Sequence, residues 1–159
     1  MSKLNRIQTS ELDRLEGYLE AAQHIFTRGE LDVTLEASLF EISDSNITDE
    51  DVIRTAYSSF NPIERCVECS LDEMMSGVND ILSIDRRFWK PDDWVPKMLE
   101  KNLREGYWQH VKSCFDYTNA KIVELGNDVP YINISGGFTC ILYAPDMSRC
   151  LLLVGNTSD

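Results

Sequence analysis

The stretch FTCILYAPDMSRCLLLV, residues 138–154, decides the fold of this chain. Two β-rich runs, Phe138 to Ala144 and Cys150 to Val154, flank Pro145-Asp146, a pair typical of the start of a turn. The run Leu151 to Val154 is apolar at every position, which predicts a central or helix-covered strand.

A third β-rich run lies just upstream, from Val129 to Ser135. Gly136-Gly137 follows it and suits a two-residue hairpin turn. Residues 119–125 fit either the end of a helix or another strand that turns at Gly126-Asn127-Asp128. The end of the chain therefore predicts an antiparallel β-meander of short strands.

The N-terminal region begins with a predicted helix. Its apolar residues recur at intervals of three and four, which places them on one helix face: Leu12, Leu15, Leu19, Ala22 and Phe26. Thr9 or Ser10 can cap this helix, and Gly29 suits its C-terminal end.

One strand is predicted before the next helix. Apolar and polar residues alternate from Leu31 to Ser38, which indicates a strand with one buried face and one acidic or polar face. Leu39-Phe40 break the alternation, so a bulge or a strand end is expected there.

Capping residues predict where further helices begin. Thr48 precedes three acidic residues, Ser70 lies three residues before Glu73, and Asn61-Pro62 resembles a third helix start. Another helix is expected from Asp92 or Asp93 to Phe115, with Gly106 as a candidate interruption.

The fold class expected is α+β: N-terminal helices with one early strand, followed by a C-terminal antiparallel β-meander. At 159 residues and 43% hydrophobic content, one domain covering residues 1–159 is expected. Met1 to Ser10 is polar and shows no targeting segment, and five dispersed Cys fit a reducing compartment, so a cytoplasmic protein is expected.

The net charge of this chain is concentrated in one stretch. Fourteen acidic and two basic residues lie between Glu30 and Asp85, and the rest of the chain is balanced, so this stretch carries the whole formal net charge of −12. Such a field suggests a surface that attracts a positively charged partner.

The acidic side chains expected to form this surface, together with three aromatic residues that could anchor a partner, come mostly from that stretch. The acidic patch comprises Asp32, Glu36, Asp49, Glu50, Asp51, Asp72 and Glu73, and the aromatic anchors are Tyr57, Phe88 and Trp89.

No catalytic or metal-binding constellation is apparent. Cys66 and Cys69 have a CxxC spacing but lack a second pair of ligands, and nearby glutamates disfavour a thiolate. Cys114 lies four residues after His110, the best thiol–imidazole pair, yet no residue is seen that would orient the imidazole. The expectation is a protein that is not an enzyme and holds no metal and no cofactor.

The pI near 4.5 also limits the partners. Binding to the phosphate backbone of nucleic acid, or to an anionic membrane surface, needs clustered Lys and Arg. A basic protein is the partner expected, with no direct nucleic acid and no membrane.

In these features the chain resembles the small acidic immunity proteins that neutralise bacterial toxins delivered between neighbouring cells. The resemblance rests on size, the acidic stretch 30–85, the lack of a catalytic site and the closing hairpins from Tyr131 to Val154. It implies a non-enzymatic inhibitor that covers the active site, or an adjacent surface, of a basic nuclease-type toxin.

Three alternatives stay open. The same surface could imitate nucleic acid towards a DNA-binding protein, as a regulatory adaptor or inhibitor. A small thiol-dependent hydrolase could use Cys114 and His110. Exposed aromatic residues on the helices could also form the interface of a homodimer.

Overall fold

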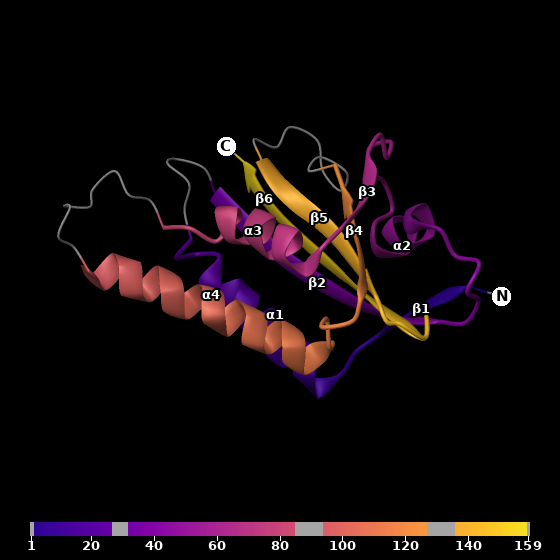
Figure 1. The fold of residues 1–159 in the computed structure, drawn as a ribbon, viewed down its shortest axis with the longest axis horizontal. Helices are drawn as coiled ribbons and strands as arrows, with labels where there is room; N and C mark the ends of the chain where they lie inside the picture. The colour runs from indigo at the N-terminus through magenta and orange to yellow at the C-terminus, as the bar shows by residue number, and fades with distance from the viewer. Residues whose placement is uncertain (1, 27–31, 85–93, 127–135, 159) are drawn as a thin grey trace.

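The structure of this protein is a computed structural model that describes residues 2–26, 32–84, 94–126 and 136–158. Figure 1 shows the arrangement of its helices and strands. In chain order they are β1 (Leu4–Ile7), α1 (Ser10–Ala22), β2 (Asp32–Ile42), α2 (Asp49–Ala56), β3 (Cys66–Cys69), α3 (Leu71–Ile81), α4 (Trp94–Cys114), β4 (Lys121–Leu125), β5 (Gly136–Tyr143) and β6 (Arg149–Ser158).

The six strands form one sheet in the order β1-β2-β6-β5-β4-β3, and all neighbours are antiparallel. Strands β4, β5 and β6 are consecutive both in sequence and in the sheet, which confirms the predicted C-terminal meander and the α+β class. The ambiguous residues 119–125 contain β4. The predicted strand Val129 to Ser135 lies outside the described residues.

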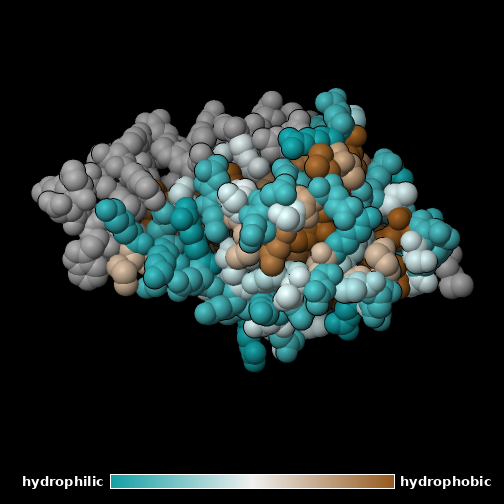
Figure 2. Space-filling view, viewed as in Figure 1, coloured by the Kyte–Doolittle hydropathy of each residue, from teal (hydrophilic) through white to brown (hydrophobic). Residues whose placement is uncertain are grey.

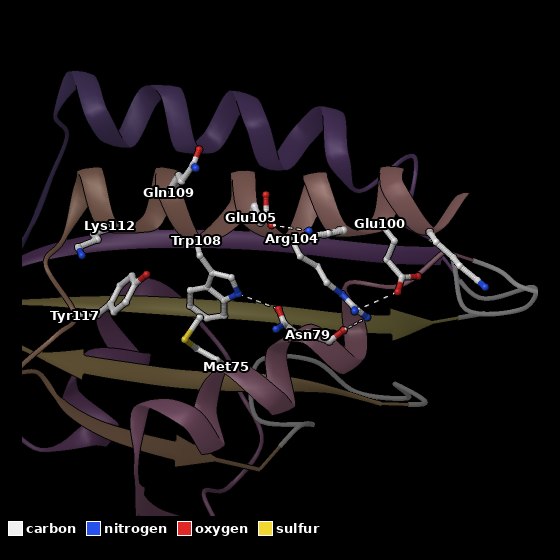
Figure 3. Close-up of a pocket in the computed structure, with 11 residues that line it drawn as sticks. Met75, Asn79, Glu100, Arg104, Glu105, Trp108, Gln109, Lys112 and Tyr117 are labelled. Atoms are coloured by element: carbon white, nitrogen blue, oxygen red, sulfur yellow. Dashed lines mark hydrogen bonds and ion pairs between the residues drawn. The ribbon is translucent and has the colours of Figure 1, made fainter. Parts of the chain in front are cut away.

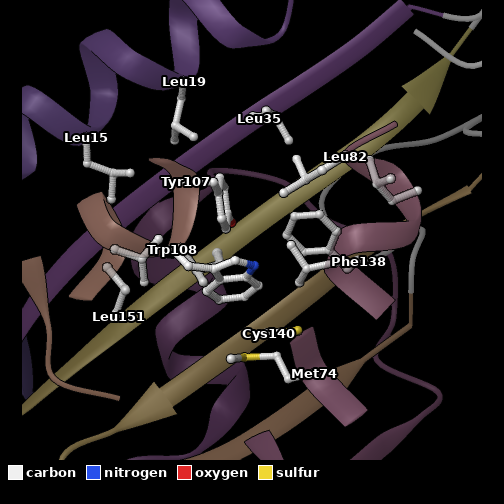
Figure 4. Packing of buried hydrophobic residues seen from close by; sticks show 14 of the residues in the cluster. Leu15, Leu19, Leu35, Met74, Leu82, Tyr107, Trp108, Phe138, Cys140 and Leu151 are labelled. Carbon is white, nitrogen blue, oxygen red and sulfur yellow. The ribbon is translucent and has the colours of Figure 1, made fainter. Parts of the chain in front are cut away.

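Both faces of the sheet are covered by helices. On one face α1, α3 and α4 pack over a large apolar cluster that includes Leu15, Tyr107 and Leu151 (Figure 4). On the other face α2 contributes Val52 and Ile53 to a second cluster. The apolar run in β6 contributes side chains to both clusters, because successive side chains of a strand point to opposite faces. This confirms the predicted central strand.

The helices begin where the capping residues predicted. Thr9 caps α1 and accepts a hydrogen bond from the Leu12 amide. Thr48 and Asp51 form a reciprocal capping box at the start of α2. Ser70 caps α3, and its side chain accepts a hydrogen bond from the Glu73 amide. Helix α1 ends at Ala22, and Gly29 lies outside the described residues.

Strand β2 differs from its prediction, because it continues through Leu39 and Phe40 to Ile42. Leu39 packs in the cluster under α1, whereas Phe40 packs in the cluster under α2. The strand therefore continues without a break. Leu39 and Phe40 are both apolar because α2 covers the second face of β2 at this point, so that both faces are buried.

The helix start predicted at Asn61-Pro62 is wrong. Residues 61–65 form no helix, and Cys66–Cys69 are the edge strand β3, paired with β4. A capping pattern there is not followed by a periodic apolar face, whereas the one at Ser70 leads into buried Met74 and Val78.

The hairpin turn predicted at Gly136-Gly137 is also wrong. Both glycines lie inside β5, opposite Thr157 and Asn156 of β6. A side chain at Gly137 would overlap the backbone of Gly155 and Asn156, so glycine here permits close approach of two strands rather than a turn. The turn predicted at Pro145-Asp146 does connect β5 to β6.

Helix α4 is not interrupted at Gly106. Instead Gly106 faces α1, where a Cβ atom would lie 2.5 Å from the Tyr18 hydroxyl oxygen. That hydroxyl donates a hydrogen bond to the Leu103 carbonyl, so the two helices are joined at the glycine. Gly106 therefore serves helix packing and not a helix end.

Hydrophilic side chains cover most of the face seen in Figure 2, around a hydrophobic area near its centre. Within the described ranges, no helix is long and apolar enough to cross a bilayer.

Candidate functional site

The predicted acidic patch is divided between two layers of the molecule. Asp49, Glu50 and Asp51 begin α2, which packs on one face of the sheet. Asp72 and Glu73 begin α3, which packs on the opposite face. The side chain of Asp32, at the start of β2, is outside the described part. The seven acids therefore do not form a single surface.

The three acids of α2 also hold the fold together. Asp51 accepts a hydrogen bond from the Thr48 amide, and Glu50 forms an ion pair with Arg54 at 2.9 Å. Asp49 accepts hydrogen bonds from the hydroxyl of Tyr143 and the thiol of Cys66. Lysine at these three positions would remove a helix cap and core contacts, so charge reversal there would not test binding alone.

Two predicted residues do come together, Glu36 and Tyr57. The Tyr57 hydroxyl donates to a carboxylate oxygen of Glu36 at 2.6 Å, which joins the end of α2 to the middle of β2. The other predicted anchors, Phe88 and Trp89, lie outside the described residues.

Glu36 and Tyr57 line a groove of about 470 Å³ that follows β2. Helix α1 and its C-cap residue form the second wall, through Glu16, Glu20 and Gln23. Leu19 and Leu35 also line it and are buried, and Arg6 is the cation of the lining. We call this the β2 groove.

The charge distribution of the sequence does not point to Glu16 and Glu20, because both precede the acidic stretch 30–85. Both are exposed residues of α1, and they are one helical turn apart. The helical pattern of the sequence places both residues on the polar side of the predicted helix. Their proximity to Glu36, however, depends on the tertiary structure. With Glu36, they give the groove three carboxylates against one guanidinium.

A second cavity, of about 590 Å³, lies between α3 and α4 (Figure 3). Its apolar wall is Met75, Trp108 and Tyr117, and the Trp108 indole donates to the Asn79 side chain at 2.9 Å. Trp108 also meets the Tyr117 ring edge to face.

The central cation of that cavity is already engaged. Arg104 donates to the carbonyls of Asn79 and Leu82 at the end of α3, at 2.8 and 2.7 Å. It also forms an ion pair with buried Glu100 at 3.1 Å. These contacts satisfy helix-end carbonyls, so we assign Arg104 and Glu100 a structural role.

The CxxC cysteines are unsuited to chelation or redox chemistry in the described structure. Cys66 and Cys69 are three residues apart on a strand, so their side chains point to opposite sides of the sheet. Desolvation and the hydrogen bond to Asp49 raise the pKa of Cys66 to about 11, although the residue is exposed. Among the described residues, no group of three metal-ligand side chains is found.

The pKa of Cys66 gives a test of this geometry. Replacing Asp49 with Asn removes a negative charge beside the thiol and should lower its pKa, while desolvation keeps it above the free value. Each unit of decrease raises the thiolate fraction about tenfold at pH 8.5. We expect alkylation of Cys66 by iodoacetamide to become several-fold faster in Asp49→Asn. Glu50→Gln is the matched control, and an equal acceleration in it would contradict the assignment.

The surroundings of Cys114 and His110 do not favour a reactive thiolate. Burial raises the pKa of Cys114 to about 11, which lowers its thiolate fraction near neutral pH. The His110 ring lies against Tyr18, with ring centroids 4.7 Å apart. The two residues share helix α4, but their described surroundings favour packing.

Comparison with known proteins shows the fold only. No family model matches this chain, and no curated protein matches it. Citrus MAF1 in a P 31 2 1 crystal has a similar structure, with TM-score 0.58 and 11% identity over 94% of this chain and 99% of that chain. A C 2 2 21 crystal of citrus MAF1 gives TM-score 0.55 and 9% identity over 93% and 98%.

Proposed function

We propose that this chain is a non-catalytic binding domain whose partner is a basic protein. The observation that carries the proposal is the β2 groove, where Glu16, Glu20 and Glu36 surround an accessible stretch of strand. Carboxylates gathered along a concave surface raise the local negative potential and speed the encounter with a positively charged partner.

The chemistry of the cysteines supports binding rather than catalysis. Burial is the first cause of the raised pKa at Cys66, Cys69, Cys114, Cys140 and Cys150, so none of these thiols is activated. The cavity between α3 and α4 has its central charges paired with each other and with backbone carbonyls.

The identity of the basic partner is proposed only as a class. A nuclease-type toxin domain and a nucleic-acid-binding protein of the same cell both present the required positive surface. The fold likeness is to a citrus protein, so it lends no support to bacterial immunity in particular. An occluding inhibitor of either partner would use the same groove.

The fold likeness supports a related proposal, that this chain is a MAF1-like protein and shares a partner with citrus MAF1. The two chains match over nearly their full lengths, so the likeness covers the whole fold and not one common motif. Parallel capture with both proteins as bait, from the same extract, tests it. One basic protein recovered by both would support the proposal, and recovery of disjoint sets would contradict it.

The direct test of the binding proposal is capture from source cells at about 50 mM and about 500 mM salt, since electrostatic encounter weakens as the Debye length shortens. We expect a basic protein that is retained at low salt and released at high salt. Retention of acidic or neutral proteins alone, or retention that is independent of salt, would contradict the proposal.

A further inference from the structure

The β2 groove contains an open sheet edge. Strand β1 pairs with β2 only over Leu39 to Ile42, and its chain then leaves the sheet to enter α1. Within the described ranges, no strand pairs with residues 32–38 on the side away from β6. Figure 1 shows β1 beside one end of the much longer β2. The position that β1 would occupy if it continued is therefore not filled by a described strand.

The backbone groups that face this position can be identified. The Leu35 amide donates to the Gln23 side chain of α1 at 3.2 Å, so Leu35 faces away from β6. In an antiparallel ladder alternate residues face the same side, so the N–H and C=O of Ala37 also face the groove. The Gln23 contact shows that an amide on this edge donates to an acceptor on the groove side.

The geometry points to a specific mode of binding: we infer that the β2 groove accepts an extended, basic segment of a partner protein, which adds a strand beside residues 32–38. This inference rests on the proposed function and names the conformation and chemistry of the partner. Main-chain hydrogen bonds to β2 would supply affinity. Alternate side chains of the added strand would contact the two walls of the groove and give specificity.

The walls of the groove fit a basic segment and disfavour an acidic one. Glu16 and Glu20 project from α1 on one side, and Glu36 lies beside Tyr57 on the other. A strand with Lys or Arg at alternate positions would direct those side chains towards Glu16 and Glu20 on the α1 wall and its apolar side chains towards Ala56 on the opposite wall. Open edges are otherwise aggregation sites, and acidic walls restrict which strands can pair.

The test uses a synthetic probe, the acetylated and amidated heptapeptide KVKVKVK, with the full-length protein. A second peptide of the same sequence, methylated on every backbone nitrogen, keeps all charges but has no backbone donors. Loss of two or three backbone hydrogen bonds corresponds to a decrease in affinity of about tenfold or more. We expect the first peptide to bind and the methylated peptide to bind at least that much more weakly.

Two variants locate the binding on β2. Ala37→Pro removes the amide that faces the groove and is compatible with an edge position, whereas Ala37→Val adds bulk but keeps the amide. We expect the proline variant to lose about as much affinity as methylation causes, with an unchanged circular dichroism spectrum, and the valine variant to lose less, because its amide is retained. If Ala37→Pro fails to fold, the comparison of the two peptides with the unmodified protein decides the question.

The outcomes separate this inference from the proposed function. Equal binding of both peptides would overturn strand addition, while leaving electrostatic recognition by the groove intact. No binding of either peptide, together with capture of a basic protein in the salt experiment, would overturn strand addition and leave the binding of a basic protein as the proposed function. Failure of the capture experiment as well would overturn both.

Discussion

Gly155→Ala is expected to destabilise this protein by about 2 kcal/mol, because overpacking of a full core costs about 1–3 kcal/mol. Gly155 lies in the central strand β6 directly opposite Phe138 of β5. A Cβ atom there would overlap the Phe138 ring, and that ring is 3% exposed and packed in the cluster under α3 and α4. The ring therefore has no solvent into which it can turn.

Urea unfolding measures the effect, and two helical glycines provide controls of the opposite sign. A Cβ atom at Gly17 or Gly77 would meet nothing within 4 Å. Alanine at either position should stabilise the protein by about 0.5–1 kcal/mol, through lower backbone entropy in the unfolded chain. Combining Gly155→Ala with Phe138→Leu should cost less than the sum of the single changes, since the shorter side chain makes room. Strict additivity would contradict the proposed overlap.

Arg104→Ala is expected to cost about 3 kcal/mol, the lower end of the range for breaking a buried ion pair, because the Arg104 side chain is 30% exposed. The change would remove the Arg104 guanidinium from the Glu100 carboxylate, which is 4% exposed in its side chain. It would also remove the donor that serves the Asn79 and Leu82 carbonyls at the end of α3.

A double variant distinguishes the ion pair from the helix-end contacts. Glu100→Gln removes the buried charge and keeps an acceptor for the Ile84 amide, which now donates to Glu100 at 3.0 Å. Arg104→Ala with Glu100→Gln should therefore recover about 1 kcal/mol relative to Arg104→Ala alone. Lys101→Ala, in an exposed pair with Glu105, should change the free energy of unfolding by less than about 0.5 kcal/mol. A similar loss in Lys101→Ala would contradict the special role of Arg104.

The sequence predicts those parts of this fold in which local chemistry and tertiary structure agree. The caps at Thr9, Thr48 and Ser70 are found where short polar side chains precede a periodic apolar face. The apolar run of β6 lies in the centre of the sheet, as its fully apolar composition predicts.

The errors have a common physical origin, which is close packing between elements distant in sequence. Gly106 looks like a helix interruption and Gly137 like part of a hairpin turn, yet each glycine permits the close approach of a neighbouring element. Strand β1 is short and mostly polar, with Leu4 buried, so no alternation long enough to predict a strand exists there. Strand β1 forms because it can pair with the edge of β2.

The candidate site was only partly predictable. The sequence singled out Glu36 and Tyr57, which line the β2 groove, but it also grouped acids that the sheet separates and that lie in the first turns of helices, such as Asp51 and Glu73. Glu16 and Glu20 belong to the groove because α1 packs beside β2. Only the tertiary arrangement brings those side chains to an open strand edge.

The central claim is that the acidic β2 groove receives a basic protein, and charge reversal in that groove tests it most directly. Association of the captured partner is measured at low salt with the wild type, with Glu16→Lys/Glu20→Lys, and with Glu64→Lys/Glu68→Lys. The last variant makes the same charge change at exposed residues in and just before β3, at the other edge of the sheet. We predict association at least about tenfold slower for the groove variant and nearly unchanged for the β3 variant, within the range of electrostatic rate enhancement. Equal slowing in both variants, or no slowing in the groove variant, would contradict the claim.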